Sequence, residues 1–423
     1  MLSVIAHHRV WALLPAGVLL SGGCAADESG RSTQVSPTRD GAPVALSSEP
    51  APESAKGVVA RGLRVVWERE CGAGEYWYTL SSVAVGVEGE IVMAAIALDS
   101  QASPPENHVL LWRIDKTGTV IDTLKIAKPA VDGRGQALDV SLSEGVQVQV
   151  LPNGEMVLAI GFVEGRPWLV RLDRHGRQLM SKELLGPDRR VTIKKMVPRS
   201  NGHFVLLGHE RLDTFAMEVD ALGNVVWENI RDRGEMDFAV DGVSTDDGGF
   251  VVIENSGQYN MLGVGPSSVW VSKYDARWAL QRELRLEGRH GRVTNTPGGR
   301  IALVYNRSTS VDQDIYVETF DRSLERVSQT RVLQSQQGLS PFSVGSCPGS
   351  GCIVGGGKHD KLFLCRMDDN GNVVWRFWGE QMPQSIDYEL LLEGDNIFVA
   401  SSVFAKGEGG YHKVVKLVKF SEE

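Results

Sequence analysis

The sequence predicts an all-β fold, a seven-bladed β-propeller, from three observations. A tight turn followed by a strand, Asp-Asp-Asn-Gly-Asn-Val-Val-Trp at 368–375, recurs as Asp-Ala-Leu-Gly-Asn-Val-Val-Trp at 220–227. A second turn that contains glycine precedes each copy, and the strand expected after the last copy stands instead near residue 65. Because a supersecondary unit that recurs at a regular period is typical of an array, we expect one blade per repeat.

The first residue of each copy is an aspartate, which we call the anchor. The anchors are Asp115, Asp173, Asp220, Asp275, Asp321 and Asp368, spaced 46 to 58 residues apart. An aspartate can accept hydrogen bonds from its own following backbone, and a glycine three positions later can adopt positive φ, so we expect a tight turn. Residues 368–371 also resemble part of a calcium loop, but the distal glutamate is absent, which favours the turn.

The second turn of each repeat predicts a β-hairpin. These turns contain Gly89, Gly154, Gly202, Gly248, Gly299, Gly349 and Gly394. Together with the anchor turn they give four strands per repeat. An aromatic residue stands five positions before five of the anchors, and we expect these side chains to pack between adjacent blades; they are Trp168, Phe215, Trp270, Tyr316 and Phe363.

The two ends of the domain predict how the ring closes. One more period after Asp368 places a seventh anchor at Ser421, after the strand-like residues 416–420, with no room for the strand that follows. The Val-Val-Trp triplet at 65–67 repeats that strand without a turn before it. We therefore expect the N-terminal strand to complete the last blade, which removes an open seam. Six or eight blades are the alternatives.

Residues 1–23 have the composition of a secretory signal peptide, with Arg9 before an apolar stretch at 10–20 that is too short to cross a bilayer. Ser-Gly-Gly at 21–23 followed by Cys24 resembles the lipobox of bacterial lipoproteins, although Ser21 replaces the usual leucine. The resemblance implies that Cys24 carries a lipid and that the protein is an outer-membrane lipoprotein, since Ala25 is not the aspartate of inner-membrane retention. The alternative is cleavage after Ala26, which gives a secreted or soluble periplasmic protein.

Residues 24–60 contain no aromatic residue and are rich in Ser, Pro, Ala and Glu, so we expect a disordered tether. The propeller domain then occupies residues 61–423. The net charge of the whole chain is −9, and removal of residues 1–23 takes away Arg9 and no acid, which makes it −10. This charge argues against nucleic acid as a partner. We expect a monomer held at the membrane by the lipid on Cys24.

Four cysteines besides Cys24 lie in the predicted domain. Cys347 and Cys352 flank a Pro-Gly-Ser-Gly turn that can bring them opposite each other, and we predict a disulfide between them. A metal-binding pair is the alternative, but two further ligands are not close in the sequence, so no metal is expected. Cys71 and Cys365 are either free or bonded to each other.

The sequence assigns no catalytic residue. It contains no zinc signature, no Gly-x-Ser-x-Gly motif and no phosphate-binding glycine loop, and the adjacent Asp246 and Asp247 fit a tight turn better than a catalytic pair. Long loops are expected on the face opposite the tight turns, where a rigid scaffold usually carries its binding residues. The candidate binding residues in these loops are Glu106, Tyr259, Asn260, Met261 and Tyr411.

The anchor repeats, together with Asp-Gly-Gly-Phe at 247–250, resemble bacterial propeller repeats that are distantly related to quinoprotein (PQQ-type) repeats. The resemblance implies the fold and no particular activity. No two cysteines are adjacent, so the vicinal pair of quinone-dependent dehydrogenases is missing and no cofactor is expected. In leader and repeat type the chain is similar to outer-membrane lipoproteins that serve in β-barrel assembly. This similarity implies a non-enzymatic binding or scaffold protein; the alternative is an envelope glycan lyase or hydrolase.

Overall fold

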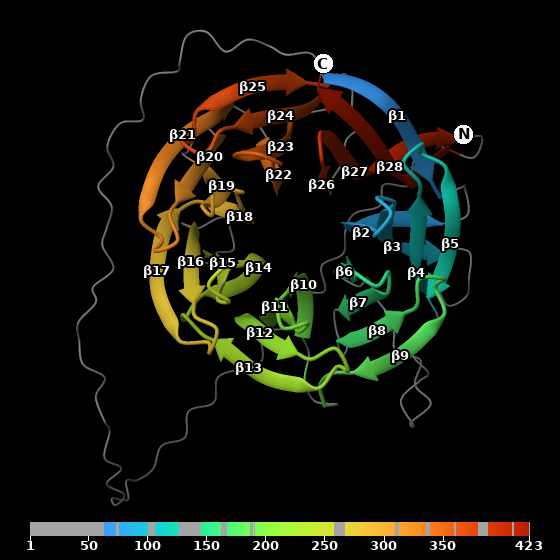
Figure 1. Cartoon of the computed structure of the whole chain (residues 1–423), viewed down its shortest axis with the longest axis horizontal. Coiled ribbons are helices and arrows are strands. Elements are labelled where there is room, and N and C mark those ends of the chain that lie inside the picture. Colours follow the sequence, from blue (N-terminus) through green and yellow to red (C-terminus); the bar gives the residue numbers. More distant parts are fainter. Residues whose placement is uncertain are drawn as a thin grey trace, which may run out of the picture. The chain divides into compact units, whose positions relative to one another are not determined.

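The structure is a computed structural model. It describes residues 63–72, 76–99, 106–126, 145–161, 167–186, 189, 191–257, 267–308, 313–335, 339–358, 361–379, 388–407 and 410–422. In these residues the regular elements are strands, and they form seven four-stranded antiparallel sheets. Figure 1 shows the sheets arranged as blades around a central axis. The described part includes no helix of the length and apolarity that a membrane crossing needs.

The first four blades follow one another along the chain, each with its innermost strand first. Blade 1 consists of β2 (Trp77–Val85), β3 (Ile91–Asp99), β4 (Glu106–Ile114) and β5 (Val120–Ile126). Blade 2 consists of β6 (Gly145–Val150), β7 (Met156–Gly161), β8 (Trp168–Leu172) and β9 (Gln178–Glu183). Blade 3 consists of β10 (Val191–Pro198), β11 (Phe204–Glu210), β12 (Asp213–Val219) and β13 (Val225–Arg231). Blade 4 consists of β14 (Met236–Ser244), β15 (Phe250–Gly257), β16 (Ser267–Tyr274) and β17 (Leu280–Glu287).

The last three blades keep the same order, except that the final one takes its outer strand from the beginning of the domain. Blade 5 consists of β18 (Arg289–Asn295), β19 (Ile301–Ser308), β20 (Gln313–Phe320) and β21 (Arg326–Ser335). Blade 6 consists of β22 (Leu339–Ser346), β23 (Cys352–Lys358), β24 (Lys361–Met367) and β25 (Val373–Trp378). Blade 7 consists of β26 (Tyr388–Glu393), β27 (Asn396–Gly407), β28 (Gly410–Glu422) and β1 (Leu63–Cys71).

The terminal strands close the ring as the sequence predicts. β1 pairs antiparallel with β28, from Leu63 opposite Glu422 to Cys71 opposite Val415. β28 continues the sheet to β27 and β26, so blade 7 contains both ends of the described chain (Figure 1). Both the seven-blade count and the closure between the N-terminal and C-terminal strands are confirmed.

The core lies between the blades. The buried apolar side chains form seven clusters, and each cluster combines residues of two adjacent blades. The predicted aromatic column follows this arrangement at four positions, since Trp168, Phe215, Tyr316 and Phe363 belong to or pack against such clusters. Trp270 differs because the guanidinium carbon of Arg233 stacks 4.1 Å from its ring centroid.

The anchor turns have the predicted hydrogen bonds. In each turn one carboxylate oxygen of the anchor accepts hydrogen bonds from the backbone N–H groups two and four residues later. In the turn at 368–371, Asp368 accepts from Asn370 and Asn372 while Gly371 has φ of 80°. These bonds account for the residues that a calcium loop would otherwise explain.

A hydrogen bond from each blade to the next repeats on the face of the tight turns, and we call it the inter-blade link. A long side chain donates to the carbonyl of the residue directly after the next blade's anchor. The donors, with the acceptor residue in parentheses, are Arg113 (Arg174), Arg171 (Ala221), Arg199 (Ala276), Lys273 (Arg322), Arg300 (Asp369) and Trp67 (Lys116). In blade 6, Arg366 donates to the carboxylate of Glu422, the residue after Ser421. The repeat therefore fixes the position of each blade relative to its neighbour.

Candidate functional site

Two of the five predicted binding residues lie in the described part of the chain, and both are found in strands. Glu106 is the first residue of β4 and pairs with Asp99. Tyr411 is the second residue of β28 and pairs with Lys406. Tyr411, which the sequence places in a long loop, therefore lies in a strand hairpin, because backbone pairing continues to Gly407 opposite Gly410. Tyr259, Asn260 and Met261 lie outside the described residues.

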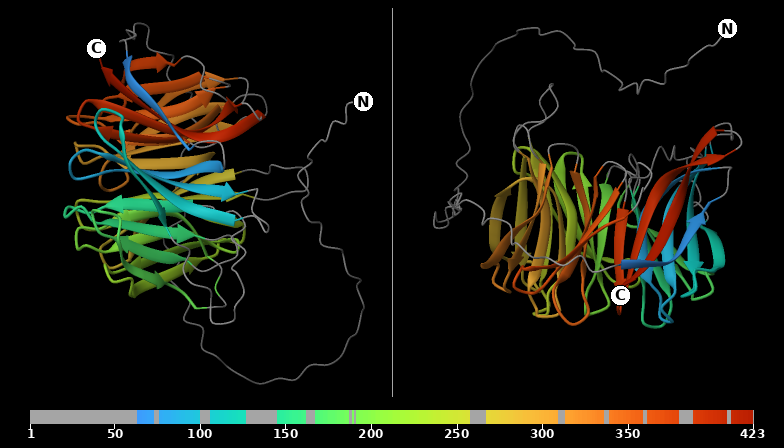
Figure 2. Two further views of the ribbon diagram at one scale, coloured as in Figure 1. Left: turned by 90° about the vertical axis from the view of Figure 1, so that its right-hand side faces the viewer. Right: turned by 90° about the horizontal axis from the view of Figure 1, so that it is seen from above.

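The β27–β28 hairpin extends beyond its own blade. β26 pairs with β27 only as far as Ser401, and β1 pairs with β28 only as far as Val415. Among the described residues, the pairs from Val403 opposite Val414 to Gly407 opposite Gly410 have no third strand, so 403–407 and 410–414 form a two-stranded ribbon. Its rise is roughly 15 Å. Figure 2 shows the ribbon standing above the ring, on the side away from the tight turns.

The base of this ribbon is held by blade 1. The Phe404 ring makes an edge contact with Trp77 at a centroid distance of 6.3 Å, and Lys413 donates to the Thr79 hydroxyl at 3.1 Å. Trp77 nevertheless keeps 46% of its surface exposed. A two-stranded ribbon is only marginally stable alone, so these contacts fix its direction. The result is a projecting element with an exposed indole beside it.

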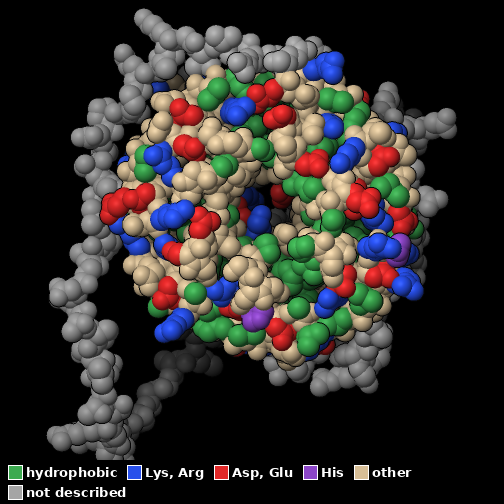
Figure 3. All heavy atoms as spheres, viewed as in Figure 1, with side chains coloured by type: hydrophobic (Ala, Val, Ile, Leu, Met, Phe, Trp, Pro, Cys, Tyr) green, Lys and Arg blue, Asp and Glu red, His purple; other side chains and the backbone are tan. Residues whose placement is uncertain are grey.

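The second feature of the described residues is a cavity of about 280 Å³ in the central channel. The innermost strands of all seven blades line it. The lining residues are Val83, Ala84, Val85, Gln147, Gln149, Lys194, Lys195, Val240, Asp241, Arg292, Val293, Ser343, Val344, Glu389, Leu390 and Leu391. Figure 3 shows the hollow at the centre of the ring with basic side chains inside it. The cavity thus combines polar and charged groups that are far apart in the sequence.

A β-bulge directs side chains toward this channel in five of the inner strands. The register shifts by one or two residues in β2, β10, β14, β18 and β22. A bulge turns the residue after it to a new direction. The residues directly after the bulges are Ser82, Lys195, Asp241, Arg292 and Ser343. We call this the post-bulge position.

In three blades the post-bulge residue joins its blade to the next one. The Ser82 hydroxyl accepts a hydrogen bond from the Val148 N–H at 3.3 Å, and the Ser343 hydroxyl accepts from Leu390 at the same distance. Asp241 accepts from the Val293 N–H at 2.9 Å. Each inner strand is an edge strand with unpaired backbone groups, and these side chains satisfy one of them.

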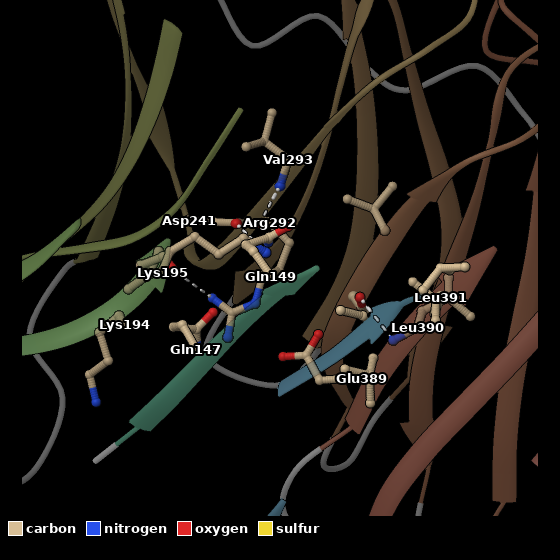
Figure 4. A pocket seen from close by; sticks show the side chains of 16 residues that line it. Gln147, Gln149, Lys194, Lys195, Asp241, Arg292, Val293, Glu389, Leu390 and Leu391 are labelled. Atoms are coloured by element: carbon tan, nitrogen blue, oxygen red, sulfur yellow. Dashed lines mark hydrogen bonds and ion pairs between the residues drawn. The ribbon is translucent and has the colours of Figure 1, made fainter. Parts of the chain in front are cut away.

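The charged groups of the channel come mainly from blades 3, 4 and 5. Lys195 Nζ lies 3.2 Å from Asp241 Oδ1, and the negative charge of Asp241 raises the pKa of Lys195 against the opposing effect of burial. Arg292 donates to the Val240 carbonyl at 3.4 Å. Figure 4 shows the guanidinium of Arg292 and the carboxylate of Glu389 both directed into the cavity. Asp241 thus contacts both the cation of blade 3 and a backbone N–H of blade 5.

The adjacent carboxylates Asp246 and Asp247 are turn residues, as the sequence indicates. Asp247 accepts hydrogen bonds from the Gly249 N–H at 3.1 Å and pairs with Lys273 at 2.8 Å. Asp246 pairs with Arg322 of the next blade at 2.8 Å. Each carboxylate has its own cation, and the two do not share a proton. Among the described residues no group of three or more His, Cys, Asp or Glu side chains is arranged to hold a metal ion.

The structure does not show the predicted disulfide. Cys347 and Cys352 are both free and buried. Cys347 packs in the cluster between blades 6 and 7, whereas Cys352 packs in the cluster between blades 5 and 6. Their side chains lie on opposite faces of blade 6, because Cys352 pairs with Ser346, and Cys347, the residue after Ser346, faces the other way. Cys71 and Cys365 are also free, in separate clusters.

The channel residues were not predicted from the sequence, although a signal for them exists. Seven positions before the hairpin glycines Gly89, Gly154, Gly202, Gly248 and Gly299 stand Ser82, Gln147, Lys195, Asp241 and Arg292. Alignment of the repeats on these glycines brings the five residues into one column. A bulge does not change the pattern of apolar and polar residues, so no single repeat indicates this column.

Neither a protein-family model nor a curated protein matches the chain. Solved structures do. A protein of unknown function from Dyadobacter fermentans is 11% identical over 86% of this chain and 100% of its own, with a TM-score of 0.52. The WD40 domain of coronin from Toxoplasma gondii is 9% identical over 87% of this chain and 89% of its own, with a TM-score of 0.50. A periplasmic gluconolactonase from Pseudomonas aeruginosa is 12% identical over 71% and 85%, at 0.45. At such identities the likeness shows the fold alone: the chain is a seven-bladed β-propeller.

Proposed function

We propose that the protein is a lipid-anchored binding or scaffold protein of the bacterial cell envelope, built from quinoprotein-like propeller repeats. The observation that carries this proposal is the ribbon at 403–414, which projects from the face opposite the tight turns beside the exposed Trp77. Aromatic side chains on a rigid projection are common anchors of protein interfaces. The partner is a protein or a glycan that contacts this ribbon and the adjacent long-loop face.

A non-enzymatic role agrees with the chemistry of the described residues. The carboxylates that line the channel are Asp241 and Glu389, and Asp241 is held by Lys195 and the Val293 N–H. Glycoside hydrolysis needs one carboxyl group that keeps its proton and another that remains charged. The contacts of Asp241 instead give it a structural role between blades 3, 4 and 5. A glycan lyase or hydrolase stays the alternative, and assays with envelope polysaccharides distinguish it by turnover.

In situ photocrosslinking tests the binding role. A photoreactive amino acid in place of Tyr411 is expected to crosslink one discrete partner in intact cells. The same group in place of Leu179, which is 53% exposed on the outer strand β9, serves as the control and is expected to give no such product. The affinity of the purified protein for this partner should fall at least tenfold when residues 406–411 are replaced by Asn-Gly, which forms a two-residue hairpin turn. Equal crosslinking at both positions contradicts the proposal.

The lipid anchor is tested separately. Incorporation of labelled fatty acid is expected for the parent chain and for Cys71→Ser, and it is expected to be lost in Cys24→Ser. Cys71→Ser is a matched control because it removes one thiol from the buried core without touching the leader. Label in Cys24→Ser at the parent level refutes the anchor, and release of unlabelled protein into the medium supports cleavage after Ala26.

A further inference from the structure

Two blades depart from the joining pattern at the post-bulge position. Ser82, Asp241 and Ser343 accept a backbone hydrogen bond from the next blade there. Blade 3 has Lys195 and blade 5 has Arg292 at the same place. Ammonium and guanidinium groups cannot accept a hydrogen bond, so these two residues contact blade 4 as donors instead: Lys195 pairs with Asp241, and Arg292 donates to the Val240 carbonyl. The same two cations also line the cavity, so they bring positive charge into the channel.

Lys195 and Arg292 help to give the channel a charge opposite in sign to the net charge of the protein. The cavity is lined by three cations, Lys194, Lys195 and Arg292, against the two carboxylates Asp241 and Glu389. The net charge of the lining is thus positive in a chain whose own net charge is −9. A concave site with low-dielectric walls focuses the field of such an excess and concentrates anions.

The backbone beside Arg292 is strained in a way that is common at binding sites. The bulge of β18 contains His290, which has φ of 58° although it is not glycine. His290 is exposed, and desolvation and the positive charges of Arg289 and Arg292 lower its pKa. Strained residues persist where the surrounding structure fixes them, often next to a ligand.

We propose that the central channel binds a small organic carboxylate that carries further hydrogen-bonding groups. The planar guanidinium of Arg292 suits a carboxylate, and the amides of Gln147 and Gln149 offer both donors and acceptors to hydroxyl or carbonyl groups. The volume of about 280 Å³ lies near the lower end of the range for small-molecule pockets, which favours a small ligand. This site is separate from the ribbon, so it goes beyond the proposed function.

Calorimetric titration of the purified domain tests the proposal. The probes are gluconate, galacturonate, malate and citrate, with galactose as the neutral counterpart of galacturonate and sulfate as an inorganic anion. We expect one site per chain for at least one carboxylate, no binding of galactose, and weaker binding at high salt. If none of the four carboxylates binds, or if sulfate binds as tightly as the best of them, the proposal is wrong.

Variants locate the site. Arg292→Gln and Lys194→Gln, on separate strands, are each expected to weaken binding about tenfold or more, as the loss of a charge-assisted hydrogen bond implies. Arg177→Gln removes the same charge from a side chain that is 81% exposed on the outside of the ring, and its affinity should equal that of the parent. Thermal melts of all variants show whether each is folded; Lys194→Gln keeps the test open if Arg292→Gln does not fold.

The sign of the effect at Glu389 distinguishes a carboxylate ligand from a cationic one. Glu389→Gln removes a negative charge from the cavity and should tighten carboxylate binding several-fold, whereas a ligand bound through an ammonium group would be weakened. Replacement of residues 406–411 by Asn-Gly should leave carboxylate affinity unchanged. A loss of carboxylate binding in that ribbon variant, or a loss in Glu389→Gln, overturns the channel site as proposed.

Discussion

Four residues other than glycine have positive φ in the described part of the chain: Arg211, Trp278, His290 and Leu324. Trp278 and Leu324 replace the glycine of an anchor turn, and both are held by packing. The Trp278 ring stacks on Trp227 at 3.4 Å and donates to Glu218, while Leu324 is fully buried. The packing of these two side chains therefore offsets the strain of the backbone. Arg211 is exposed and has no comparable packing.

Arg211 lies at the exposed turn between β11 and β12 with φ of 56°. A left-handed backbone conformation costs a residue other than glycine roughly 1 to 2 kcal/mol. Glycine removes this steric cost, but its greater conformational entropy in the unfolded chain cancels part of the gain in stability. Arg211→Gly should therefore stabilise the domain by up to about 1 kcal/mol in urea unfolding. Leu212→Gly, one position later at ordinary φ, should destabilise it. Equal effects of the two substitutions contradict this account.

Asp247 makes stability depend on acid pH. Burial opposes its charge, but hydrogen bonds from Lys273 and Thr245 outweigh burial and lower its pKa to about 2. Since the folded pKa is below the unfolded value of about 3.9, the contribution of Asp247 is complete above pH 4 and is lost as the pH falls through 2. Asp247→Asn should thus be less stable than the parent at pH 7, with the difference vanishing near pH 2. Asp246→Asn, where both partners are 67% exposed, should differ little at any pH.

At the scale of elements, β1 closes the ring, because it pairs with β28 in the last blade. It contributes Trp67, which donates to the Lys116 carbonyl of blade 1 at 3.0 Å and contacts the Phe398 ring at 6.0 Å. A chain that begins at Gly72 lacks this strand, exposes the edge of β28 and opens one inter-blade link. Trp67 is partly buried, so its removal should cost less than the roughly 3 to 5 kcal/mol typical of a fully buried large aromatic, but the lost strand pairing adds to this cost. We expect the melting temperature to fall sharply.

The matched control for that truncation is a chain that begins at Ser54, just before the predicted domain. It retains β1 and every described contact of blade 7, so its thermal unfolding should match that of the mature protein. If the chain that begins at Gly72 melts at the same temperature as this control, β1 does not complete blade 7 in solution.

The strands could be predicted where the turns between them depend on particular residues. Asp220 and Asp368, with Gly223 and Gly371 three residues later, mark turns that the structure confirms. The extension of β27 and β28 was not predictable, because residues 403–414 have the glycine and polar content of a loop and become strands through support from Thr79 and Trp77. Local composition gives the turns, whereas tertiary contacts decide where a hairpin ends.

At the scale of the whole molecule, the cysteines report cooperative unfolding. Desolvation by burial raises the pKa of Cys71, Cys347 and Cys365 to about 12 and also raises that of Cys352. A thiol reagent should therefore find no reactive group in the folded domain without Cys24 and four groups after complete unfolding. Titration in denaturant checks this number. Two reactive thiols instead of four would show that one pair of cysteines is oxidised, which contradicts the four free cysteines of the structure.

The candidate site could be predicted only in part, for a reason that applies to the whole ring. The long-loop face follows from strand order, and Tyr411 does lie at the tip of its hairpin. The channel depends on side chains such as Lys195, Asp241 and Arg292, which are about 50 residues apart and meet only when seven blades close. Each looks like an ordinary charged residue of a half-buried strand, so its role becomes visible only after the register of every inner strand is known.

The pairing of β1 with β28 also determines how the domain responds to mechanical tension. Under the proposed anchor, the membrane pulls on the Leu63 end of β1, while a partner on the ribbon pulls on the Gly410 end of β28. These ends lie at opposite ends of an antiparallel pair that runs over eight residue pairs. The load then acts in shear, so that all its hydrogen bonds resist together instead of opening one by one. The strand pair that closes the ring is therefore suited to withstand force between the membrane and a bound partner.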